Sequence, residues 1–249
     1  MTWPRLVRAE LRKISTTKLP WGFLAVLIVV AGLNGSVVIW GTDMDGSKTF
    51  ISTALDQQSL MAFAANAMIG TGLFGAIAVA REFGHNTVVP TFLTCPRRYR
   101  AVLAQFTAIT IVGGLLGLVG EALVIGAVAG ALPFTDYGFL ASADGVLQLL
   151  AASTWAGAAG ALLGGGLGAL VRNVGGAVTA AVVLLFIVPP LVVQLLSDAA
   201  SWLPDALNRV VAGVATDPVS VPAALAALAA WAVIPAALGL LAIERRDVV

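Results

Sequence analysis

The sequence predicts an all-α integral membrane protein with six transmembrane helices. Of its 249 residues, 59% are hydrophobic and only 11% are charged, whereas about 25% of residues are charged in an ordinary soluble domain. Six apolar segments reach the length of about 20 residues that a helix needs to cross hydrocarbon. Lysine and arginine gather in alternate connections between these segments, as the positive-inside rule expects of a multi-pass protein.

The apolar segments define the expected spans, and we treat residues 1–249 as a single transmembrane domain. The spans are expected at about residues 20–40, 60–80, 101–132, 146–170, 174–196 and 222–243. The first is too long for a signal-peptide core, and no A-x-A cleavage pattern follows it, so we expect it to be retained. The third would extend about 48 Å at 1.5 Å per residue, so it must tilt or protrude.

Residues 1–19, ahead of the first span, are expected to hold an amphipathic helix. In the stretch WPRLVRAELRKI the apolar side chains fall on one arc, and Glu10 intrudes on it. Such a helix lies on a membrane surface. It is either a basic anchor that sets topology or an elbow that contacts a cytosolic partner. The residues assigned to that contact are Arg8, Glu10, Arg12 and Lys13.

A polar island at residues 80–100, AREFGHNTVVPTFLTCPRRYR, interrupts the apolar sequence after span two. It holds four arginines, Glu82, and the only histidine and only cysteine of the chain. Positive-inside anchoring explains the arginines. It does not explain the apolar middle, Val88, Val89, Phe92 and Leu93, which needs a surface to pack on. That surface is either the membrane interface or another protein.

Span four carries glycines at four-residue spacing: Gly160, Gly164 and Gly168. This small-xxx-small pattern predicts close helix packing. It does not predict a phosphate loop, because no G-K-[ST] follows and no strand precedes it. In span five, Pro189 and Pro190 are expected to kink or break the helix.

Between spans five and six, a short outer helix is expected to begin at Pro204. A proline in the first turn, with Asp205 beside it, is typical of a helix start. Apolar residues then recur at helical spacing up to Val214. We therefore expect a short re-entrant helix whose apolar face dips into the outer leaflet.

The basic residues orient the chain in the membrane. With the N-terminus inside, the inner segments 1–19, 81–100, 171–174 and 244–249 hold five, four, one and two basic residues, twelve of the fourteen. Both termini are therefore expected in the cytoplasm. Arginine outnumbers lysine eleven to three, and Ala, Gly and Val are abundant. This composition is typical of a GC-rich bacterial genome, so we expect a bacterial cell (inner) membrane.

Two stretches carry a family resemblance. RAELRKI before the first span, and GAIAVAREFGHNTVVPTFLTCPRRYR after the second, resemble the ABC-2 class of ABC transporter permeases. That class has an acidic residue after span two, a GT-like element, a coupling helix and a P-x-R exit into span three. The matching positions here are Glu82, Asn86 with Thr87, about 88–95, and Pro96 to Arg98. Asn86 replaces the usual glycine, and Gln105 lies where a lysine often occurs, which leaves the subgroup open.

The resemblance implies a permease subunit whose polar island docks in a cleft of a separate ATPase. The implied ATPase-coupling residues are Glu82, Thr87, Val88, Val89, Phe92, Leu93 and Arg97. This chain has no nucleotide motif, so it would not be an enzyme by itself and would hold no cofactor. ATP and Mg would bind to the partner subunit. A second permease chain, identical or related, would complete a dimer that exports a hydrophobic or amphipathic drug, antibiotic or lipid-like molecule.

Glu121, the one acid within a span, supports an alternative. Intramembrane carboxylates are functional candidates, and Glu121 could carry protons in a secondary transporter, although no internal repeat is visible. It lies about 30 Å from the inner end of its helix, where we expect water to reach it. Together with Asn66, Thr154 and Gln194 it forms a candidate translocation path. Each of these side chains is also suited to hydrogen bonding with a neighbouring helix.

Other classes of function find little support. A net charge of +1 gives no basis for binding nucleic acid. One cysteine excludes an internal disulfide. An intramembrane enzyme is disfavoured, because no aspartate pair lies within the spans and Cys95 has no nearby base. The expected partners are therefore the lipid bilayer, the ATPase subunit and a second permease chain.

Overall fold

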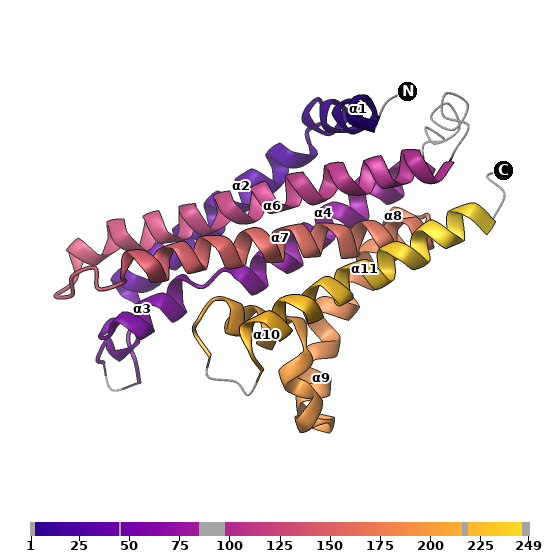
Figure 1. Cartoon of the computed structure of the whole chain (residues 1–249). Coiled ribbons are helices and arrows are strands. Elements are labelled where there is room, and N and C mark those ends of the chain that lie inside the picture. The colour runs from indigo at the N-terminus through magenta and orange to yellow at the C-terminus, as the bar shows by residue number, and fades with distance from the viewer. Residues whose placement is uncertain (1–2, 45, 85–97, 216–218, 246–249) are drawn as a thin grey trace.

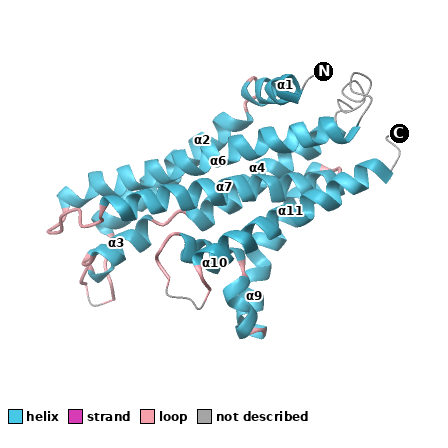
Figure 2. Ribbon diagram, in the orientation of Figure 1, coloured by secondary structure: helices cyan, strands magenta, loops and turns pink. Residues whose placement is uncertain are grey.

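The computed structural model describes residues 3–44, 46–84, 98–215 and 219–245. Of these described residues, 86% are helical and none lies in a strand, so Figure 2 shows only helices joined by loops. Six helical segments are long and apolar enough to cross a membrane, as expected of a multi-pass membrane protein. They are Leu19–Trp40, Ala54–Gly84, Tyr99–Phe134, Ala143–Val171, Val174–Leu195 and Val221–Arg245.

The bundle has two distinguishable ends. Helix α1 (Trp3–Ser15) and the last turn of α11 (Val221–Arg245) lie at one end, which we call the terminal end. The opposite, distal end carries α3 (Ala54–Met61). Helix α2 (Leu19–Trp40) follows α1 and packs mainly along α6 (Arg98–Ala131). Helix α1 also packs on α6, and its Ile14 is buried there.

The second span is divided. After the short η1 turn (Thr49–Ile51), helix α3 ends at Met61, and α4 (Ala64–Gly84) begins after two non-helical residues, Ala62 and Phe63. A capping box starts α3, in which Thr53 and Asp56 exchange backbone-to-side-chain hydrogen bonds. The sequence predicted one continuous helix over 60–80, so the division is a feature it did not reveal.

Helix α7 (Ala143–Val171) is the central element, against which α4, α6 and α11 all pack. A Cβ added to Gly160, Gly164 or Gly168 would collide with backbone atoms of α4. On another face, Gly157 approaches the backbone of α6 in the same way. Side chains are thus absent where backbones touch, which confirms the packing role predicted for this glycine pattern. Helix α6 is followed by the short η2 turn (Leu132–Phe134).

The fifth span changes its helical form midway. It consists of α8 (Val174–Val182), a π-helical segment η3 (Val183–Ile187) and α9 (Val188–Leu195). Pro189 and Pro190 lack N–H groups and cannot donate to the carbonyls one α-turn earlier. The nearest available donor, Val188 N–H, bonds to the carbonyl of Val183 five residues back. Figure 1 shows α9 diverging from the bundle after this segment.

The short helix before the last span begins where the sequence predicted. After the η4 turn (Ser197–Trp202), α10 runs from Pro204 to Val211. Its apolar side chains, however, are buried within the protein, against α4, α7 and α11. The expectation that this face dips into the lipid is therefore wrong, because the bundle itself offers the apolar surface that the helix needs.

A Schellman motif ends α10. Gly213, at φ 72°, donates to the carbonyl of Val210, and Val214 donates to that of Arg209. Two amide side chains fasten this end to the bundle: Gln148 of α7 donates to the carbonyl of Val211, and Gln58 of α3 donates to that of Ala212. The helix is thus held by hydrogen bonds as well as by apolar contact.

Candidate functional site

An ion-paired junction at the terminal end joins α1 to α4. The ammonium nitrogen of Lys13 lies 2.5 Å from Glu82 Oε1 and 3.2 Å from Glu10 Oε2. Glu82 is buried, with 8% of its surface exposed, so Lys13 reaches a carboxylate that the bundle has largely withdrawn from solvent. A partly buried charge pair of this kind is screened by salt less than a fully exposed pair is.

This junction explains the acid on the apolar side of α1. Glu10 lies one turn before Lys13 and shares its ammonium group with Glu82. Arg8 and Arg12 are exposed, and neither has an ion-pair partner within the described part of the chain. Of the four predicted elbow-contact residues, Glu10 and Lys13 therefore bind within the protein, while Arg8 and Arg12 face outward.

Of the predicted ATPase-coupling residues, Glu82 is the one within the described part of the chain. Glu82 lies in the last turn of α4. Thr87, Val88, Val89, Phe92, Leu93 and Arg97 lie outside the described residues. The predicted coupling helix therefore lies outside them as well.

Arg172, which the sequence indicated only as a turn residue, strengthens the same end of the bundle. Its guanidinium carbon lies 5.4 Å from the centre of the Phe83 ring, and its Nη2 donates to the carbonyl of Ala242 at 3.0 Å. Arg172 itself adopts φ 57°, the left-handed conformation that ends α7. One side chain thus links the ends of α4, α7 and α11. The only sequence signal was a single arginine in the shortest predicted connection.

Glu121 occupies a second polar junction, at the break in span two. Its side chain has no exposed surface, which corrects the expectation that water reaches it. Oε2 accepts a hydrogen bond from the backbone N–H of Phe63 at 3.1 Å and another from the Ser153 hydroxyl. A carboxylate at the N-terminus of a helix satisfies an N–H group and interacts favourably with the helix dipole. Glu121 therefore caps α4 from a neighbouring helix and links it to α7.

The four residues of the candidate translocation path do not share one site. Asn66 is exposed in the first turn of α4, and Thr154 donates to the carbonyl of Leu150 on its own helix at 2.7 Å. Gln194 is exposed and lines a cavity of about 460 Å³, which Asn66, Glu121 and Thr154 do not line. Within the described residues, Gln194 is thus the path residue that adjoins a cavity of ligand size.

Comparison with known proteins assigns no family to the chain. No protein-family model matches the sequence, and no curated protein matches it. Among the described residues, no group of three or more His, Cys, Asp or Glu side chains is placed to hold a metal ion. The helix arrangement and the two polar junctions are the features of the chain that bear on its function.

Replacing Glu121 tests its role as a cap. In Glu121→Gln an acceptor oxygen remains for Phe63 and Ser153, so we expect nearly unchanged stability. Glu121→Leu leaves both donors buried and unpaired, and an unsatisfied buried group costs about 1–3 kcal/mol. We expect a clear fall in the thermal unfolding temperature of the purified protein in mild detergent. Gln194→Leu, which changes an exposed amide, serves as the control.

Equal destabilisation by Glu121→Gln and Glu121→Leu would contradict the capping role. It would show that the charge, rather than the acceptor oxygen, is what the fold requires.

Proposed function

We propose that the chain is the membrane-embedded permease subunit of an ATP-driven exporter of the ABC-2 class, with ATP and Mg bound by a separate cytoplasmic ATPase subunit. The observation that carries the proposal is the contact between Lys13 and Glu82. It brings together the two stretches in which the sequence resembles that class, the first helix and the end of the second span. The terminal end is then cytoplasmic, and α1 is the elbow helix.

The arrangement suits transmission of a force from a partner. Residues 85–97 lie between α4 and α6 in the sequence. Helix α4 meets α7 with glycines at the contact, and α7 also packs on α6 and α11. Close-packed helices transmit displacement because their interior is nearly incompressible. A partner that moves the coupling segment would therefore displace the central helices together, and the displacement would reach α10 at the other end of α4.

The exposed surfaces support a second permease chain. Of the 18 most apolar consecutive residues of α2, only 17% are buried, and the fraction is the same for the fifth span. These two spans have the least contact with the rest of the chain, so they face lipid or another subunit. A dimer of identical or related chains in a bacterial cell membrane accounts for both surfaces and would place a translocation path between the subunits.

Affinity purification of the tagged chain in mild detergent from its native host tests the proposal. We expect an ATPase to co-purify in a near one-to-one ratio, and to be lost when residues 86–95 are replaced by a neutral linker. Recovery of the linker variant at normal yield and with normal helicity would show that the spans still fold. A homo-oligomer without an ATPase, from a preparation that keeps other membrane complexes intact, would contradict the proposal.

A proton-coupled secondary transporter that uses Glu121 is the second candidate. The observation in its favour is that Oε1 of this fully buried carboxyl group has no hydrogen-bond partner within the described residues. Under this candidate, Glu121→Gln would abolish transport driven by a proton gradient, and no ATPase would be required. Under the exporter proposal, Glu121→Gln would retain ATP-driven transport.

A further inference from the structure

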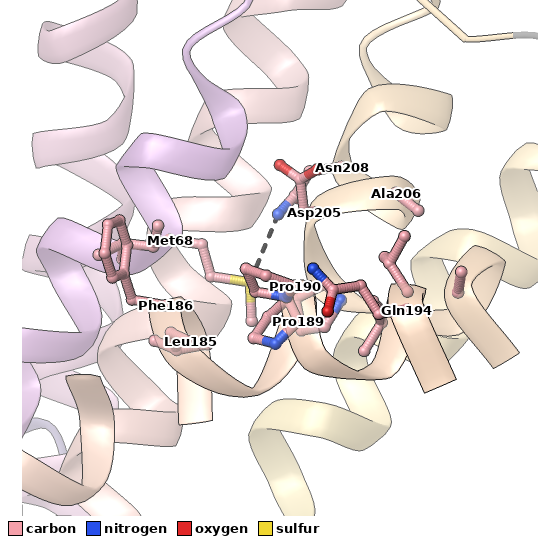
Figure 3. Close-up of a pocket in the computed structure, with 14 residues that line it drawn as sticks. Met68, Leu185, Phe186, Pro189, Pro190, Gln194, Asp205, Ala206 and Asn208 are labelled. Atoms are coloured by element: carbon pink, nitrogen blue, oxygen red, sulfur yellow. Dashed lines mark hydrogen bonds between the residues drawn. The ribbon is translucent and has the colours of Figure 1, made fainter. Parts of the chain in front are cut away.

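The cavity beside Gln194 lies at the divergence of the fifth span from the bundle. Its walls come from α4, η3, α9, η4 and α10, and its volume is about 460 Å³, within the range of small-molecule sites. Figure 3 shows Met68, Leu185, Phe186, Pro189 and Pro190 as its apolar side. Pro189 and Pro190 make part of this surface rigid, and the flexible Met68 side chain can adjust to an apolar body.

The polar part of the wall is concentrated on α10. Asn208 is 1% exposed, and its amide nitrogen donates to the Met68 sulfur at 3.4 Å. A thioether is a weak acceptor, and the amide oxygen has no hydrogen-bond partner within the described residues. A buried amide that is so poorly satisfied destabilises the fold. Asn208 therefore lies in the wall of the cavity with an amide oxygen that is unpaired within the described part of the chain, which folding does not explain.

A negative charge stands beside this amide. Asp205 lines the same cavity, is exposed, and precedes Asn208 by three residues, so both lie on one face of α10. No ion pair to Asp205 occurs in the part of the chain that the structure describes. A carboxylate next to an apolar surface attracts cations and raises their local concentration. The amide oxygen of Gln194 adds a further acceptor in the wall.

From these features we propose that this cavity binds an amphipathic organic cation. The apolar body of the ligand packs on Phe186, Pro189 and Pro190, and its positive group lies against the Asp205 carboxylate. The exposed amide of Gln194 supplies a polar contact at that side, and the buried Asn208 amide lies behind it. The inference rests on the proposed function and deepens it, because it names the chemical class of the exported molecule.

Tetraphenylphosphonium and tetraphenylborate form the probe pair, because they match in shape and differ in the sign of their charge. We expect the purified chain in detergent to bind the phosphonium saturably in equilibrium dialysis, above the level of protein-free micelles. Asp205→Asn should weaken this binding about fivefold, the upper range for one partly exposed charge pair. Ala206→Phe, which fills the cavity, should abolish it.

Asp198→Asn is the matched control, since Asp198 is an exposed acid that precedes α10 and does not line the cavity. It should bind the phosphonium like the unmodified chain. Equal binding of tetraphenylborate, equal weakening by Asp198→Asn, or no saturable binding would each overturn the proposal. Ala206→Phe is informative only if the variant keeps normal helicity. If Ala206→Phe does not fold, Asp205→Asn alone tests the proposal.

The assay needs no ATPase, so it separates this inference from the proposed function. If the chain did not bind the phosphonium but an ATPase still co-purified, the chain would remain an exporter subunit with another class of cargo. If the chain bound the phosphonium but no ATPase co-purified, the exporter proposal would be overturned and the cation site would remain.

Discussion

Replacing Gly164 with alanine is expected to cost more stability than the same change at the other glycines, because its added Cβ would make the shortest contact. The new Cβ would collide with the carbonyl oxygen of Gly72 at the point where α7 crosses α4. Overpacking of a rigid site costs about 1–3 kcal/mol when side chains can adjust. Here the obstacle is a helix backbone, so we expect at least the upper part of that range. Thermal unfolding of the purified protein in mild detergent measures the effect.

Gly126→Ala in α6 is the control for this substitution. A Cβ at Gly126 would meet nothing within 4 Å, and alanine is the better helix former by about 1 kcal/mol. We expect an unchanged or slightly higher unfolding temperature. If both variants unfolded alike, the close approach of α7 and α4 would not be what holds the bundle together.

Breaking the ion pair between Lys13 and Glu82 is expected to detach α1 from α4 without unfolding the spans. In Lys13→Met the Glu82 carboxylate stays buried but loses its 2.5 Å partner. Because Glu82 is buried and Lys13 is partly exposed, the cost is expected between about 1 kcal/mol for an exposed pair and about 3–5 kcal/mol for a fully buried one. We expect faster backbone hydrogen exchange over residues 3–15, and a loss of most substrate-stimulated ATPase activity in the complex with the proposed partner.

Charge exchange supplies the matched control. Lys13→Glu combined with Glu82→Lys should restore slow hydrogen exchange in α1 and part of the coupled ATPase activity. Glu82→Gln alone should speed the exchange in α1 and lower the coupled activity. Arg8→Met, which removes an exposed charge from the same helix, should leave the exchange rates unchanged. Slow exchange in every variant would show that apolar packing of Ile14 suffices to hold α1. Slow exchange with lost coupling would place the role of the pair in partner binding.

The lengths of the apolar runs made the six spans predictable. The first span was expected at 20–40 and the structure has Leu19–Trp40; the last was expected at 222–243 and the structure has Val221–Arg245. A membrane helix must form its backbone hydrogen bonds within itself across a hydrocarbon layer of fixed thickness. Its start and end therefore follow from the local run of apolar residues. The same holds for the start of α10, because a proline in the first turn acts within one turn of chain.

Contacts between distant residues were not predictable in this way. No proline or charge marks the break in span two, and the carboxylate that caps it lies 58 residues away, on another helix. The apolar spacing of residues 203–214 predicted an amphipathic helix, but periodicity does not say whether lipid or protein covers its apolar face. Likewise, the spacing of Glu10 and Lys13 is that of a helical ion pair, but the sequence did not show that Glu82 shares the same ammonium group.

The π-helical segment in the fifth span makes the length of that span a structural constraint. A hydrogen bond to the fifth residue back accommodates one residue more than an α-turn does. Deleting Leu184 would therefore close the wide turn to an α-turn and leave the following residues facing nearly as before, whereas deleting a residue from α8 with the wide turn kept would rotate all that follows by about 100°. Pro189 and Gln194 would then turn away from α10, although no residue in contact with a ligand had been changed. Related chains that keep both this wall and the wide turn must therefore keep the number of residues between Val174 and Pro189, even where their side chains differ.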